Sequence, residues 1–201
     1  MYRLYDYLPS GNGYKVRLLL AQLATPFELV EVDILKGLTR TPEFLAKNPN
    51  GRIPTLEIEP GVFLPESNAI LFYLAEGTPF FPSDRLGRAR VWQWMCFEQY
   101  SHEPNIATVR FWVSHDLLTP ERRAQLDQKR TLGYAALGVM EQHLERRAFF
   151  VGERYSIADI ALFAYTHVAG EGGFDLAPYP AVRAWVERVR GEPRHVPITQ
   201  R

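Results

Sequence analysis

Residues 48–56 read Asn-Pro-Asn-Gly-Arg-Ile-Pro-Thr-Leu, and this stretch decides the fold. It places an Ile-Pro bond at the entrance to an expected strand, and X-Pro is the peptide bond for which the cis form costs least. A proline at the start of a strand also removes a donor that would otherwise pair within the sheet. We predict that the bond between Ile53 and Pro54 is cis. The backbone N–H and C=O of Ile53 would then point outward and pair with another extended backbone.

A second stretch, residues 65–70, reads Pro-Glu-Ser-Asn-Ala-Ile and stands at the entrance to an expected helix. Ser67 is predicted to cap a helix that begins near Asn68. The N–H groups of a first helical turn favour a carboxylate, and the neighbouring Glu66 favours an ammonium group. Together the two stretches predict a site for a short peptide with a zwitterionic end. The simpler alternative is that the first is only a turn and the second only a helix cap.

Both motifs resemble the glutathione-site motifs of the cytosolic glutathione transferase family, and the chain looks like a bacterial member of its serine-type or nu-like classes. The resemblance implies that Ile53, before the cis Pro54, binds the cysteinyl backbone of glutathione. It implies that Glu66 and Ser67 bind the γ-glutamyl end and, more weakly, that Arg52 lies near the glycyl carboxylate. It also implies a homodimer.

Composition limits the functional classes. Hydrophobic residues make up 46% and charged residues 23% of the 201 residues, an ordinary globular balance. The 23 basic and 23 acidic residues cancel, so nothing favours nucleic acid as a partner. No apolar run is long enough to span a membrane and no signal peptide is recognisable, so we expect a cytoplasmic protein. The single cysteine, Cys96, excludes an intrachain disulfide, a CxxC pair and a cysteine-based zinc site, and we expect it to be buried.

The periodicity of the chain changes at residues 78–84. Before them, strand and helix patterns alternate in the order β-α-β-(α)-β-β-α, which predicts a thioredoxin-like domain over residues 1–77. Residues 78–84 contain two prolines and are expected to be a linker. After them helical periodicity dominates, so residues 85–201 are predicted to form an all-α helical bundle. The fold class is therefore α+β. In the bundle, Ser156 and Asp159 are spaced as a capping box, which we interpret as structural.

The turn after the first strand holds the candidates for thiol chemistry. A thioredoxin-like redox enzyme would carry CxxC here, whereas residues 10–13 read Ser-Gly-Asn-Gly. Any reactive thiol must therefore come from the bound peptide, and a donor to its sulfur would favour the thiolate. Ser10 and Asn12 are the candidate donors, by resemblance to serine-type and nu-like transferases. Tyr5 and Tyr7 are the alternatives, although we expect them to be packing or rim residues.

The second substrate is less well defined by the sequence. Trp112 is the candidate contact from the helical domain, although aromatic residues at helical spacing are more often core. The histidines have no ligand-like spacing, so no metal is predicted.

The leading hypothesis is a glutathione transferase that activates bound glutathione for attack on a small electrophile, in a detoxification role. A sharper alternative is a glutathione-dependent disulfide oxidoreductase, favoured by the Ser-x-Asn-Gly pattern. A third is a non-catalytic ligand-binding protein of the same fold. A maleylacetoacetate isomerase fits less well, since the Ser-Ser-Cys turn usual in such enzymes is absent.

Overall fold

The computed structural model describes residues 1–200, which form two compact units. The first unit contains Met1–Thr78 and the C-terminal segment that begins at Pro193. The second contains Pro79–Glu192. The sequence assigned all of residues 85–201 to the helical domain, so the position of the C-terminal segment corrects that expectation.

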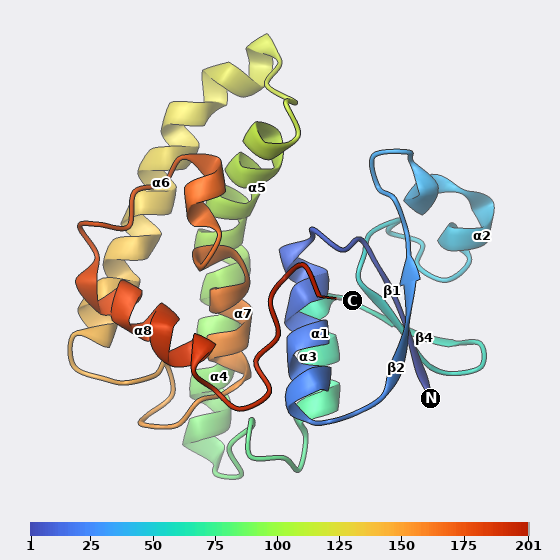
Figure 1. Ribbon diagram of the computed structural model, residues 1–201, viewed down its shortest axis with the longest axis horizontal. Helices are drawn as coiled ribbons and strands as arrows, with labels where there is room; N and C mark the ends of the chain where they lie inside the picture. Colours follow the sequence, from blue (N-terminus) through green and yellow to red (C-terminus); the bar gives the residue numbers. More distant parts are fainter. Residues whose placement is uncertain (201) are drawn as a thin grey trace. The chain divides into compact units, whose positions relative to one another are not determined.

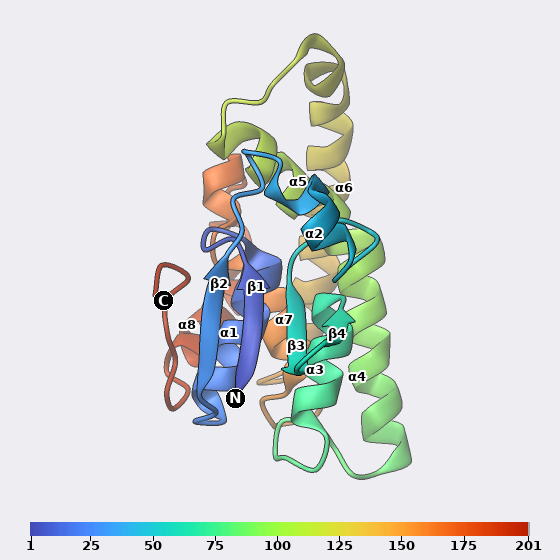
Figure 2. The ribbon, with the colours of Figure 1, turned by 90° about the vertical axis from the view of Figure 1, so that its right-hand side faces the viewer.

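The first unit is built on a four-stranded mixed sheet with the strand order β2-β1-β3-β4. Strands β1 and β2 are parallel, whereas β3 is antiparallel to both β1 and β4. Helices α1 and α3 lie together behind the sheet in Figure 2. This is the predicted thioredoxin-like order. The bounds are β1 (Tyr2–Asp6), α1 (Gly11–Gln22), β2 (Phe27–Glu31), η1 (Leu38–Arg40), α2 (Pro42–Leu45), β3 (Thr55–Glu59), β4 (Val62–Pro65) and α3 (Ser67–Ala75).

The core between the sheet and the two helices is fully apolar at its centre. Leu4 on β1 and Leu56 on β3 are opposite each other in the antiparallel register, and both are inaccessible to solvent. Ile70 of α3 and Leu19 of α1 are equally buried. Burying each such side chain contributes about 1.5–3 kcal/mol, so this core stabilises the packing of β1 and β3 against the two helices.

The second unit is helical, as the periodicity predicted. A π-helical segment joins its first two helices. Pro104, which has no N–H to donate, lies in the first turn of the following helix, directly after the π-helical segment. The bounds are α4 (Arg85–Phe97), η2 (Glu98–His102), α5 (Glu103–Ser114), α6 (Pro120–Leu144), α7 (Ile157–Thr166), η3 (Ala169–Gly172) and α8 (Pro180–Arg190).

The predicted capping box begins α7, and its acid does more than cap. The N–H of Ser156 donates to Asp159 Oδ2 at 2.9 Å. The N–H of Phe150 and the indole N–H of Trp185 both donate to Oδ1, at 3.1 and 3.0 Å. Burial raises the pKa of Asp159 to about 6, and these hydrogen bonds oppose the rise. Asp159 therefore connects α7 to the preceding loop and to α8.

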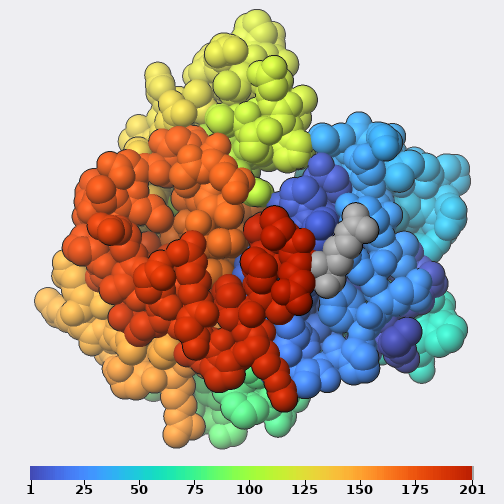
Figure 3. Space-filling view, in the orientation of Figure 1, coloured from blue at the N-terminus to red at the C-terminus, as the bar shows by residue number. Residues whose placement is uncertain are grey.

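The C-terminal segment belongs to the first unit because it is hydrogen-bonded to α1. The hydroxyl of Tyr14 donates to the carbonyl of Val196 at 2.7 Å. The guanidinium of Arg17 donates to the carbonyls of Ile198 and Gln200 at 2.9 and 2.7 Å. Figure 1 shows the segment that begins at Pro193 beside α1, and in Figure 3 its dark red atoms border the blue atoms of the N-terminal region.

Cys96 corrects another expectation, because it is exposed rather than buried. It lies on α4, where Trp92 is also exposed and Trp94 is buried against Phe97 and Phe150. This helix therefore presents Trp92 and Cys96 outward and Trp94 inward. Within residues 1–200, no helix combines the length and apolar character needed to cross a membrane.

Candidate functional site

Three segments of the first unit converge at one end of the sheet. They are the loop before β3 with Ile53, the start of α3 with Ser67, and the turn between β1 and α1 with Asn12. The pairing of β3 with β4 brings the first two together, since Thr55 is opposite Pro65. A hydrogen bond of 3.2 Å from Ser67 Oγ to Asn12 Oδ1 connects the second to the third. The residues predicted from separate motifs are thus neighbours.

The loop before β3 has the predicted backbone form. The Ile53-Pro54 bond is cis, which confirms that prediction. Within the described part of the chain, the N–H and C=O of Ile53 have no hydrogen-bond partner. Arg52 is exposed, and its guanidinium contacts no acidic group in residues 1–200. Ile53 is therefore able to pair with an added extended backbone.

Asn48, in the motif before this bond, fixes the conformation of the loop by its hydrogen bonds, a role not predicted from the sequence. Asn48 is buried, and its amide donates to the carbonyl of Arg52 at 2.7 Å and to Thr55 Oγ1 at 3.3 Å. Gly51 has a φ of +61°, and a Cβ there would lie 2.9 Å from the carbonyl oxygen of Thr39. Asparagine and glycine at these positions thus shape the loop that presents Ile53.

The start of α3 differs from the predicted cap. The helix begins at Ser67, and Glu66 stands at the capping position without a side-chain cap bond. The prediction that Ser67 caps the helix is therefore wrong. Its hydroxyl instead accepts a hydrogen bond from the ammonium of Lys15 at 3.4 Å and donates to Asn12. Glu66 is exposed and has a φ of +72°, a left-handed value that residues other than glycine rarely adopt.

The turn after β1 carries Ser10 and Asn12 into the first turn of α1. Ser10 is the N-cap, and its hydroxyl oxygen accepts the N–H of Gly13 at 3.4 Å. That oxygen can still donate its own hydrogen to a ligand. Asn12 is half-buried, and its amide oxygen faces Ser67. Two polar side chains therefore stand at a helix N-terminus, which itself favours an anion.

A buried ion pair between Asp6 and Arg17 lies next to the turn that joins β1 to α1. Asp6 accepts from Arg17 Nε at 3.0 Å, and Arg17 Nη2 also donates to the carbonyl of Leu8 at 2.6 Å. Asp6 lies so close to α1 that a Cβ on Gly13 would overlap its carboxylate. Burial raises the pKa of Asp6 to about 7, against the opposing influence of Arg17. The turn is thus held by a charge pair that is almost inaccessible to solvent.

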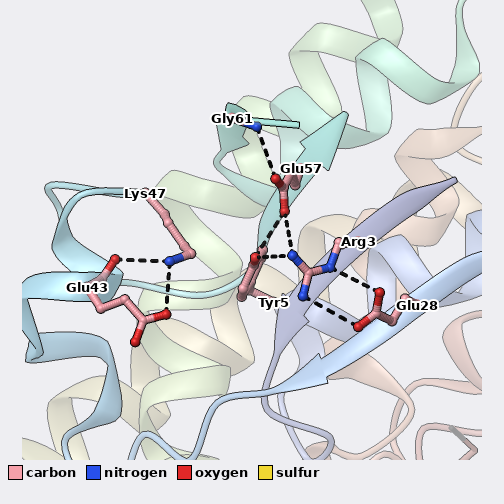
Figure 4. A network of polar contacts seen from close by, with 7 residues as sticks. All are labelled: Arg3, Tyr5, Glu28, Glu43, Lys47, Glu57 and Gly61. Atoms are coloured by element: carbon pink, nitrogen blue, oxygen red, sulfur yellow. Dashed lines mark hydrogen bonds and ion pairs between the residues drawn. The ribbon is translucent and has the colours of Figure 1, made fainter. Parts of the chain in front are cut away.

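Tyr5 is removed from the thiol chemistry by its own hydrogen bonds. Figure 4 shows its hydroxyl donating to Glu57, at 3.0 Å, within a network that includes Arg3 and Glu28. The ring packs with Val32 and Phe44 in a small core cluster. Burial, and then the hydrogen bond to Glu57, raise the pKa of Tyr5. The expectation that Tyr5 is a packing residue is confirmed.

Two further candidates have different surroundings. Burial raises the pKa of Tyr7, and the nearby Asp33 and Glu31 raise it further, so its hydroxyl stays protonated. Its place at the rim of the site stays a prediction. Trp112 lies in α5 of the second unit, where the cationic groups of Arg122 and Lys129 each stand 5.6 Å from its ring. Its role toward a second substrate stays a prediction.

The side chains that most often bind metal ions are those of histidine, cysteine, aspartate and glutamate. No group of three or more such residues that could hold a metal ion occurs in the described residues 1–200. His102, fully buried, instead makes a 2.9 Å hydrogen bond to Thr166, and His143 stacks on Phe150.

Comparison with known proteins extends over nearly the whole chain. Residues 1–76 match the family model described as "Glutathione S-transferase, N-terminal domain", and residues 92–193 match its C-terminal counterpart. The crystal structure of a glutathione S-transferase from Pseudomonas fluorescens Pf-5 is similar, with 55% identity, a TM-score of 0.96 and 99% coverage of both chains.

Two relatives of this chain have names that state different activities. The disulfide-bond oxidoreductase YfcG of Escherichia coli K12 is 34% identical over 197 residues, which cover 93% of this chain and 89% of the relative. The maleylacetoacetate isomerase of Rhizobium meliloti 1021 is 34% identical over 194 residues, covering 94% of this chain and 91% of the relative.

Proposed function

Because this chain belongs to the glutathione transferase family, we propose that it binds glutathione in its first unit and activates the thiol for attack on a small electrophile. The observation that carries the proposal is the hydrogen bond between Ser67 and Asn12. It joins the segment suited to an α-amino acid end to the segment that carries a donor at a helix N-terminus. One glutathione molecule spans both.

Each part of the proposed site has a role. The backbone of Ile53, presented before Pro54, pairs with the cysteinyl backbone, since its N–H and C=O have no partner in residues 1–200. Glu66 accepts from the γ-glutamyl ammonium, and the backbone at Ser67 binds the carboxylate. Arg52, exposed next to Ile53, is proposed for the glycyl carboxylate.

Activation requires only placed donors. A free thiol has a pKa near 8.5, so about 3% is thiolate at pH 7. Hydrogen bonds from Ser10 and Asn12 to the sulfur favour the anion, and the N-terminus of α1 adds to them. No general base is needed, because the thiolate is itself the nucleophile.

The test is to replace both donors and titrate the thiol of bound glutathione by its ultraviolet absorbance. Ser10→Ala and Asn12→Ala should each raise that pKa and lower the rate near pH 7 by about ten- to hundredfold, the value of a hydrogen bond to a charged group. The double variant should lose more, and all losses should shrink at high pH.

Ser10→Thr, which keeps the hydroxyl, is the matched control. Circular dichroism checks that the capping change has not unfolded α1. A wild-type pKa in the double variant would refute the donor roles.

A glutathione-dependent disulfide oxidoreductase is the second candidate. The Ser-x-Asn-Gly turn and the similarity to the Escherichia coli oxidoreductase favour it. The same thiolate would attack a disulfide sulfur instead of a carbon electrophile. Parallel assays with a chloronitrobenzene and with a small mixed disulfide separate the two. Activity in neither, with glutathione still bound, would support a non-catalytic binding protein.

A detoxification role and a cytoplasmic location, where glutathione is kept reduced, belong to the leading proposal. So does the contact of Trp112 with the electrophile.

We also propose a homodimer that uses the outer face of α4 and η2. This face carries the exposed side chains of Trp92, Cys96 and Tyr100, and the Tyr100 side chain is 88% exposed. Light scattering should give about 46 kDa, twice the 23.1 kDa of one chain. Trp92→Glu should shift the mass toward the monomer, whereas Leu132→Glu, on the equally exposed face of α6, should not. A wild-type mass near that of a single chain would contradict the proposal.

A further inference from the structure

Lys15 is a lysine with no exposed surface, in the second turn of α1. Lysine is almost never fully buried without a partner. Its Nζ lies 3.4 Å from Ser67 Oγ, and Ser67 Oγ lies 3.2 Å from Asn12 Oδ1. The three side chains form a continuous chain of hydrogen bonds between α1 and the start of α3. The proposed function gives roles to Ser67 and Asn12 but none to Lys15.

The direction of this chain follows from which atoms can donate. A lysine ammonium has three donors and no acceptor, so Ser67 Oγ must accept from Lys15. A serine hydroxyl has one hydrogen and two lone pairs, so accepting from Lys15 leaves its hydrogen free to donate. That hydrogen is directed to Asn12 Oδ1 at 3.2 Å, which places the amide oxygen toward Ser67 and the NH₂ group away from it.

We propose that Lys15 is a positioning residue that sets the orientation of the Asn12 amide, so that NH₂ rather than oxygen is presented to the sulfur of bound glutathione. The inference rests on the proposed function. Lys15 occupies one of the two lone pairs of Ser67 Oγ and so favours the arrangement in which the hydroxyl hydrogen points to Asn12 Oδ1. Without Lys15 both lone pairs are open to the amide NH₂, and rotation of the Asn12 amide becomes less costly. An amide oxygen beside the sulfur would disfavour the thiolate, because it offers a dipole of the wrong sign.

The relay also couples two parts of the glutathione site. Ser67 stands where the γ-glutamyl end is proposed to bind, and Asn12 where the sulfur is proposed to lie. The Ser67 hydroxyl that contacts Asn12 therefore lies at the proposed γ-glutamyl position, so a ligand bound there also contacts the group that orients the Asn12 amide.

Lys15→Met keeps an unbranched side chain as far as the ε position and removes the terminal donor. At saturating glutathione, the variant should raise the pKa of the bound thiol and lower the rate near pH 7 by about tenfold, with the loss shrinking at high pH. Adding Lys15→Met to Asn12→Ala should cause no further rise in that pKa, because the amide that Lys15 orients is gone. Lys36→Met is the control: it removes the same charge from a side chain that is 77% exposed, and the thiol pKa should not move.

The outcomes separate the two proposals. An unperturbed thiol pKa in the wild-type complex would refute the proposed function itself. A lowered wild-type pKa that Lys15→Met leaves unchanged would overturn the role of Lys15 alone, as would full additivity with Asn12→Ala. If Lys15→Met does not fold, Ser67→Ala breaks the same chain with Lys15 retained. It should raise the thiol pKa without adding to Asn12→Ala, and an unchanged pKa would again overturn the inference.

Discussion

Replacing Asp159 with alanine should lower the free energy of unfolding by at least about 3 kcal/mol, the largest loss we expect in the second unit. The change leaves the N–H groups of Phe150, Ser156 and Trp185 without their acceptor in a buried setting. Each unpaired buried donor costs roughly 1–3 kcal/mol. A cap alone contributes only about 0.5–2 kcal/mol, so the excess measures the contacts that Asp159 makes outside its own helix.

Urea denaturation at constant pH measures the loss, and an exposed cap gives the control. Thr119 caps α6 through the N–H of Arg122 at 3.3 Å, and its hydroxyl also hydrogen-bonds to Glu121 in the first turn of the same helix. Thr119→Ala should therefore cost about 0.5–2 kcal/mol. If Asp159→Ala costs no more than this control, Asp159 is a cap and nothing else.

Arg17→Met should destabilise the first unit by about 3–5 kcal/mol, because removing one partner of a buried ion pair leaves an uncompensated charge. Arg17 is 2% exposed and Asp6 is not exposed at all. The variant also removes the donor to the carbonyls of Leu8, Ile198 and Gln200. The turn that holds Ser10 and the C-terminal segment should both loosen.

The deficit should depend on pH in a definite direction. Burial raises the pKa of Asp6 from 3.8 to about 7, and Arg17 opposes that rise. The folded state therefore binds the proton more tightly than the unfolded state, and stability from this group falls as pH rises from about 4 to about 7. Without Arg17 the pKa of Asp6 rises further, so the loss caused by Arg17→Met should be larger at pH 8 than at pH 5.

Urea denaturation at these two pH values provides the measurement. Adding Asp6→Asn to Arg17→Met should restore part of the stability at pH 8, because the isolated charge is gone. Arg190→Met, which breaks an exposed pair with Glu187, should cost at most about 1 kcal/mol at either pH. An equal deficit for Arg17→Met at both pH values would show that Asp6 is not the cause.

Elements whose signals are local could be predicted from the amino-acid sequence. The Ile53-Pro54 bond, the order of strands and helices in the first unit and the capping box at Ser156 all depend on residues within a few positions of one another. Proline and helix caps restrict the backbone directly, so their effects can be predicted without knowing what packs against them. The candidate site was predictable for the same reason, since each of its motifs is short.

Which side chains contact one another depends on the tertiary structure, and several residues have roles that differ from those predicted. Lys15 and Ser67 are 52 positions apart and Arg17 and Gln200 are 183 apart, so no periodicity relates them. Ser67 forms part of a relay instead of capping its helix, and Asp159 connects α7 to α8. Cys96 faces outward although its neighbours are apolar. For Lys15, Arg17, Ser67 and Asp159 the deciding factor is the partner that packing supplies, because a polar group is stable in the interior only where another part of the chain satisfies it.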